Sequence, residues 1–152
     1  MMLNIQRFFI LVTGLFFSCN CYAWNELGHM VIANIAYQQL QPVTREKVDI
    51  MTTNLSKEYP AISNFMQMAP WADTLHSQKI ETYTHWHYID IPFSTDGTPI
   101  KNIIDTDNVL WAISQIIPVV QNQQANIYER ARFLAFLIHF VGVLLRIFLE
   151  LA

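Results

Sequence analysis

Histidine is the residue type in this 152-residue chain best suited to metal chemistry, and it occurs at five positions: His29, His76, His85, His87 and His139. Taken singly, a histidine on an apolar helix is usually a satisfied core residue or an exposed one. Together with a carboxylate, however, imidazole nitrogens form a donor set that suits zinc, and Asp73 offers such a carboxylate. The sequence has no dense local zinc motif, so a metal site would take its ligands from scattered segments.

The surroundings of three histidines sharpen this hypothesis. His139 lies within the apolar run Phe136–Val141, and an imidazole buried there needs a polar partner, of which a metal ion is one. His85 and His87 alternate along residues 82–91, whose aromatic and β-branched types predict extended chain. In an extended segment both rings would face one side.

Residues 1–23 have the three parts of a secretory signal. Arg7 supplies a positive charge, Phe8–Phe17 is an apolar run too short to span a bilayer, and a small and polar region ends at Ala23. We therefore expect cleavage after Ala23 and an exported protein, periplasmic or secreted. Lipoprotein processing at Cys19 is the alternative, which the bulky residues before that cysteine disfavour.

Cleavage after the signal would make Trp24 the first residue of the mature chain. Its free α-amine would have a pKa of about 7.7–8.0, so a metal ion could bind the neutral form at modest proton cost. The Trp24 carbonyl could complete a chelate ring, and His29 follows about one helical turn later. This end of the chain is therefore a candidate zinc ligand rather than a loose tail.

Composition narrows the possible classes of function. Both cysteines lie within residues 1–23, so the mature chain cannot form a disulfide and depends on its core or on metal for stability. The net charge of -3, made more negative by the loss of Arg7, argues against a broad basic surface for nucleic acid. It does not exclude an enzyme that holds phosphates through bound cations. The length suits one domain, and 53% hydrophobic residues exclude a disordered chain.

Apolar residues recur at helical spacing through most of the chain, which predicts an all-α fold with one extended segment at residues 82–91. The first helix should span residues 25–41, and Thr44 should cap the second. A third helix should begin at Pro70–Trp71, and Asp107 should cap a fourth.

The second half of the chain carries two further signals. Pro118 should kink or end the fourth helix, because proline lacks an amide hydrogen. A last helix should run from about Ile127 to at least Val141. Residues 133–149 also resemble a membrane helix, but the run is slightly short and Arg146 is costly in lipid. We expect an exposed apolar surface there instead, and no membrane partner.

Four short pieces of the chain match motifs of one enzyme family: Trp24–His29, Trp71–Asp73, Trp86–Asp90 and Phe136–Gly142. On these pieces the sequence resembles the zinc-dependent single-strand-specific nucleases and 3′-nucleotidases, which share a fold with zinc-dependent phospholipase C. The order and separation of the pieces agree with that family across about residues 24–142. Each piece is weak alone, whereas the four together are specific.

The resemblance implies a mostly helical, phospholipase C/nuclease-like domain with three zinc ions in a cleft. It implies that the amine and carbonyl of Trp24, with His29, bind one zinc. It implies that Asp73, His87 and His139 bind a second. The other two histidines match no ligand position of the family.

The reaction that the resemblance implies is hydrolysis of a phosphodiester at its 3′ oxygen, which leaves a 5′-phosphate. Single-stranded DNA and RNA would be substrates, and the same site would remove 3′-phosphates from nucleotides. A zinc-bound water supplies hydroxide near neutral pH, and the charge of zinc stabilises the phosphoryl oxygens. The resemblance implies no protein partner.

The sequence departs from the family pattern directly after Gly142. There the family has an aspartate that bridges two zinc ions, four residues after the histidine and on the same helix face, whereas this chain has Val143. The ligands of the third zinc have no counterpart before Ala152. We therefore expect a domain truncated to its N-terminal half, by a frame change or a truncated reading frame, with real divergence as the alternative. The three expected segments are a signal peptide over 1–23, the N-terminal part of a zinc nuclease domain over 24–142 and an aberrant tail over 143–152.

Such a chain should hold at most about one zinc and have little or no nuclease activity. Retained activity would require substitute ligands such as His85 or Glu150. Two alternatives stay open, a zinc-dependent phospholipase C of the same fold and a non-enzymatic remnant. The motifs Trp71–Asp73 and Trp86–Asp90 favour the nuclease over the phospholipase.

Overall fold

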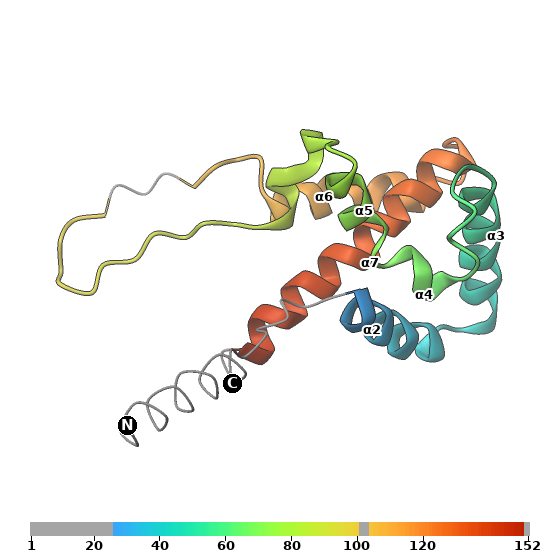
Figure 1. Cartoon of the computed structure of the whole chain (residues 1–152), viewed down its shortest axis with the longest axis horizontal. Coiled ribbons are helices and arrows are strands. Elements are labelled where there is room, and N and C mark those ends of the chain that lie inside the picture. The colour runs from blue at the N-terminus through green and yellow to red at the C-terminus, as the bar shows by residue number, and fades with distance from the viewer. Residues whose placement is uncertain (1–25, 101–103, 151–152) are drawn as a thin grey trace, which may run out of the picture.

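The computed structural model describes residues 26–100 and 104–150, and every regular element within these ranges is helical (Figure 1). The prediction of an all-α fold is therefore confirmed. The proposed signal peptide and Trp24 lie outside the described residues. In chain order the elements are α2 (Glu26–Gln39), α3 (Pro42–Glu58), α4 (Phe65–Met68), α5 (Trp71–Ser77), η1 (Glu81–His87), α6 (Val109–Gln121) and α7 (Ile127–Glu150).

The long helix α7 is the element on which the others pack, and it contacts each of the other described elements (Figure 1). Its buried Phe136 and Phe140 stack with ring centroids 5.5 Å apart, and Phe136 meets the Trp71 ring of α5 edge-on at 5.2 Å. Aromatic pairs of this kind contribute about 0.5–1.5 kcal/mol beyond the burial of their area. The core around α7 thereby fixes α5 and η1, which carry two of the predicted ligands.

The first part of the chain folds as the sequence predicts, with small shifts of the helix ends. Helix α2 covers Glu26–Gln39 of the expected residues 25–41. Helix α3 begins at Pro42 rather than behind a Thr44 cap, because a proline in the first turn lacks only an amide hydrogen that the helix would leave unpaired anyway. Helix α5 begins at Trp71, as predicted.

The prediction of extended chain over residues 82–91 is wrong for its first part. Residues Glu81–His87 form the short 3-10 helix η1. Its aromatic residues face the core, since the ring centroids of Tyr83 and Trp86 lie 4.8 and 5.8 Å from that of Phe136. Packing against a helix, rather than pairing with a strand, explains the residue types of this segment.

Beyond η1 the chain leaves the body of the molecule as an irregular arm, defined here as residues 89–100 and 104–107 and visible as the yellow loop of Figure 1. The amide of Val109 donates to the Tyr88 carbonyl at 3.0 Å and closes the base of the arm. Phe93 on the arm is 81% exposed. The arm therefore adds little to the core.

Helix α6 begins and ends differently from the prediction. Asn108, rather than Asp107, is the N-cap, and its side chain accepts hydrogen bonds from the amides of Leu110 and Trp111. Of the two effects predicted for Pro118, an end of the helix is wrong, because the helix continues to Gln121. Proline at position 118 has no amide hydrogen to donate to the Ser114 carbonyl one turn earlier, so α6 continues with one backbone hydrogen bond missing.

Helix α7 begins at Ile127 as predicted and runs through Val141 without a break to Glu150. Val141 and Leu145 are both exposed, at 41% and 42%. Within the described ranges, none of the helices combines the length and apolar character that crossing a membrane requires.

Candidate metal centre

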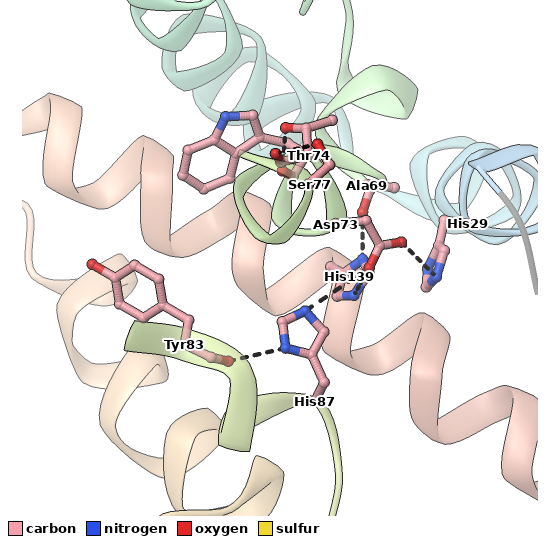
Figure 2. Close-up of polar contacts among 9 residues, drawn as sticks. His29, Ala69, Asp73, Thr74, Ser77, Tyr83, His87 and His139 are labelled. Carbon is pink, nitrogen blue, oxygen red and sulfur yellow. Dashed lines mark hydrogen bonds and ion pairs between the residues drawn. The ribbon is translucent and has the colours of Figure 1, made fainter. Parts of the chain in front are cut away.

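Asp73, on α5, lies at the centre of a cluster of three histidines that come from three other elements (Figure 2). His29 belongs to α2, His87 to η1 and His139 to α7. Their Nε2 atoms lie 3.9, 4.0 and 3.5 Å, respectively, from a carboxylate oxygen of Asp73. His29 faces Oδ2, whereas His87 and His139 both face Oδ1. We refer to these four residues as the Asp73 cluster.

Two of the imidazoles are held by backbone carbonyls, as the dashed lines of Figure 2 show. His139 Nδ1 lies 2.9 Å from the Ala69 oxygen, and His87 Nδ1 lies 3.0 Å from the Tyr83 oxygen. A carbonyl oxygen only accepts, so each Nδ1 carries a hydrogen, and in the neutral form of each ring Nε2 presents its lone pair. Among the described residues neither Nε2 atom has a hydrogen-bond partner, although both are buried. Such nitrogens are costly unless something binds them.

The members of the Asp73 cluster differ in their exposure to solvent. His139 is 0% exposed and His29 is 3% exposed, whereas the Asp73 side chain is 53% exposed. Burial is the main cause that lowers the pKa of His139 to about 4, the charge of His87 acts in the same direction, and the hydrogen bond to Ala69 opposes it. His139 is therefore neutral at pH 7, which is the form that binds metal.

The imidazole rings pack against one another around the carboxylate. The rings of His29 and His139 stack, with centroids 4.2 Å apart and planes 21° from parallel. The ring of His87 meets that of His139 edge-on, with centroids 5.0 Å apart. The three rings are thus in contact in sequence, with His139 between His29 and His87, and all three lie near Asp73 (Figure 2).

The donor set and its spacing fit a zinc ion. Imidazole nitrogens and a carboxylate are ligands of tetrahedral zinc at about 2.0–2.2 Å, which places ligand atoms about 3.3–3.6 Å apart. The separations of 3.5–4.0 Å between Asp73 and the histidines are close to that value. Ligand atoms of His29, Asp73 and His139 all lie within 4.8 Å of one another.

A cavity of about 560 Å³ borders Asp73, and its lining includes Glu26, Glu58 and the ring of Trp71. Among the residues that the structure describes, the lining contains three carboxylates and no lysine or arginine. The cavity therefore favours cations over phosphates next to the cluster.

The other predicted or rejected ligands lie elsewhere. His85 Nδ1 lies 3.4 Å from Asp105 Oδ2 at the base of the arm, so the prediction that His85 and His87 face one side is wrong. In η1 the two residues are part of a helical turn and meet different neighbours. His76 is exposed on α5. Trp24, the fifth predicted ligand, lies outside the described residues.

The geometry describes a cluster of potential metal ligands in a helical protein, and comparison with known families adds the class of protein. A family profile described as S1/P1 Nuclease matches residues 24–144. The chain belongs to the S1/P1 nuclease family. All four residues of the Asp73 cluster lie within the matched range, and the family hydrolyses phosphodiesters of nucleic acid and is in general zinc-dependent. No curated protein matches the chain.

Sequence reasoning did not find the groups that orient the imidazoles. The Ala69 carbonyl is a backbone group, so no residue type marks it. The Tyr83 carbonyl lies four residues before His87, a spacing that would have pointed to it if the segment had been interpreted as helical. The Trp86 indole donates to Asp107 at 2.7 Å and joins η1 to the start of α6, and the sequence contains no signal for this pair.

Proposed function

We propose that this S1/P1 nuclease binds zinc at the Asp73 cluster and that the site is built for hydrolysis of phosphodiesters in single-stranded DNA and RNA and of 3′-nucleotides. The products would be 5′-phosphates. The observation that carries this proposal is the pair of buried Nε2 atoms, of His87 and His139, that face a carboxylate without any hydrogen-bond partner in the described residues. A cation between these atoms would satisfy all of them.

The two oxygens of Asp73 support a division of the ligands between two ions. Oδ1 faces His87 and His139, which would complete one zinc site together with Asp73. Oδ2 faces His29, which would serve a second zinc with the amine and carbonyl of Trp24. Cleavage after Ala23 and export are parts of this proposal, because the Trp24 amine is free only in the processed chain.

The residues of the chain prepare the site before any ion arrives. The carbonyls of Ala69 and Tyr83 fix the tautomers of His139 and His87, and burial keeps His139 neutral. Asp73 supplies the negative charge that offsets part of a dication's charge. Zinc bound at such a site lowers the pKa of a water molecule toward 7 and stabilises developing charge on phosphoryl oxygens.

Calorimetric titration of the metal-free protein with zinc tests the metal site. We expect at most about one tightly bound zinc per chain, lost in Asp73→Ala. His76→Ala is the matched control, because it removes an exposed imidazole from the same helix. Equal zinc binding by Asp73→Ala and the unmodified protein would refute the metal site.

Val143 limits the activity that we propose for the chain as it stands. The family resemblance places a bridging carboxylate at this position, and valine has no donor atom. We therefore expect little or no release of acid-soluble nucleotides from single-stranded DNA with added zinc. Strong activity that disappears in His87→Ala would contradict this expectation.

Restoring the carboxylate is the complementary test. Val143→Asp should increase the amount of zinc bound per chain, because position 143 lies one turn beyond His139 on α7. Val141→Asp is the matched control, since it adds the same charge to an exposed position of the same helix. Equal zinc binding by the two variants would show that position 143 does not serve the site.

A further inference from the structure

Helix α7 contains a glycine, Gly142, at a position where the backbone conformation does not require one. Gly142 is buried in the interior of the helix. Among the described residues the glycine with a positive φ is Gly97, so Gly142 is not required by a left-handed backbone. A glycine inside a helix is less stable there than alanine. A neighbour outside α7 must therefore account for the missing side chain.

That neighbour is His29 of α2. A Cβ atom at position 142 would lie 2.6 Å from Nδ1 and 3.3 Å from Cε1 of the His29 ring. Real Cβ atoms essentially never approach another heavy atom within 3.0 Å, so something would have to shift. The His29 ring is poorly placed to shift, because it is buried and stacks on His139. His139 is itself fully buried and bonded to Ala69.

We propose that Gly142 is a positioning residue for the Asp73 cluster, because the absence of its side chain lets the His29 ring stack on His139 within 3.9 Å of Asp73. A methyl group at position 142 would displace the ring or separate α2 from α7. The effect on metal rests on the proposed function, whereas the steric contact does not. Gly142→Ala is therefore favoured by helix propensity but disfavoured by its contact with the His29 ring.

The variant Gly142→Ala tests the inference with two measurements, the melting temperature in EDTA and the zinc Kd. Helix propensity alone predicts a higher melting temperature. The steric contact predicts a melting temperature lower by about 5 °C or more. It also predicts a zinc Kd weaker by about tenfold or more, because a displaced His29 ring would disturb the His139 ring on which it stacks. Val141→Ala, at the exposed neighbouring position, should raise helix propensity and leave the Kd unchanged.

The double variant Gly142→Ala/His29→Ala keeps the test decisive if the single variant folds poorly. With the imidazole removed, alanine at position 142 has room, so the double variant should melt higher than Gly142→Ala. Its zinc Kd should equal that of His29→Ala, because Gly142 acts through His29. A Gly142→Ala protein with a raised melting temperature and an unchanged Kd would overturn the proposal, as would a double variant no more stable than Gly142→Ala.

The two measurements also separate this inference from the proposed function. If the unmodified protein binds no zinc while the melting temperatures still show that removing His29 rescues Gly142→Ala, the proposed metal site fails. The role of Gly142 in placing His29 is then supported by the stability data alone.

Discussion

The Asp73 cluster is assembled in two different ways on its two sides. His29 and His139 come from α2 and α7, stack on each other and are buried by helix packing. His87 comes from η1 and keeps 21% of its side chain exposed. It is held by a hydrogen bond to Tyr83, by edge-on contacts with the rings of His139 and Phe140, and by the pair of Trp86 with Asp107 at the base of the arm. One side of the cluster is therefore part of the core, whereas the other combines ring contacts at the edge of the core with polar contacts that can be removed singly.

The largest difference should appear when a ligand is removed from each side. His139→Ala should weaken the zinc Kd by about 100-fold or more and also lower the melting temperature in EDTA, because it leaves a cavity in the core. His87→Ala should weaken the Kd to a similar degree with little change in melting temperature. Calorimetry and thermal unfolding measure both quantities. Equal loss of melting temperature in the two variants would contradict the comparison.

Lowering the pH should reduce the free energy of unfolding of the metal-free protein through His139, on the core side of the cluster. The pKa of His139 is lowered to about 4 in the folded state, whereas an unfolded histidine titrates near 6.5. The unfolded chain then binds more protons between these values, so stability falls as the pH drops through this window. For His139 the loss between pH 7 and pH 5 is about 2 kcal/mol.

Urea unfolding in EDTA at pH 7 and pH 5 measures this loss. His139→Gln should reduce the difference between the two pH values, whatever its effect on stability at either one, because glutamine does not titrate. An unchanged pH difference in that variant would assign the acid sensitivity to another group.

A smaller change in zinc Kd should follow from removing the hydrogen bond between Trp86 and Asp107 near His87. Asp107→Ala removes the acceptor of the Trp86 indole and should weaken the zinc Kd by about tenfold through His87. Asp107→Asn keeps an acceptor oxygen and should stay near the unmodified protein. Isothermal titration compares them, and equal Kd values for Ala and Asn would show that this hydrogen bond does not position His87.

The smallest effect should come from the arm itself. Phe93→Ser replaces an 81% exposed ring and should change the free energy of unfolding by less than about 0.5 kcal/mol. Urea unfolding measures this value. A large loss would mean that the arm packs against the body in solution.

The sequence predicted the parts of the fold that depend on local periodicity. The extent of α2 and the start of α7 follow from apolar spacing, and the start of α5 follows from Pro70. It failed at η1, because aromatic residues are enriched both in strands and in segments that cover a helix, and Phe136 lies far along the chain. Of the two effects predicted for Pro118, an end of the helix is wrong, because α6 continues to Gln121.

For the candidate site, the residue types could be identified from the sequence, whereas the contacts between them come from the structure. The sequence singled out His29, Asp73, His87 and His139, and the fold brings all four together. The contact between His29 and Asp73 and the steric need for Gly142 could not be predicted, since both depend on how α2 approaches α7. The ligand roles themselves stay predictions.

The exposure of Asp73 has a consequence for the kinetics of the proposed zinc binding. A cation arriving from solvent meets the 53% exposed carboxylate before the buried imidazoles, beside a cavity that Glu26 and Glu58 make electronegative. Attraction of this kind speeds association and weakens with ionic strength. Release, by contrast, requires the ion to leave the buried nitrogen of His139. The association rate would therefore be governed by surface carboxylates and the residence time by the core.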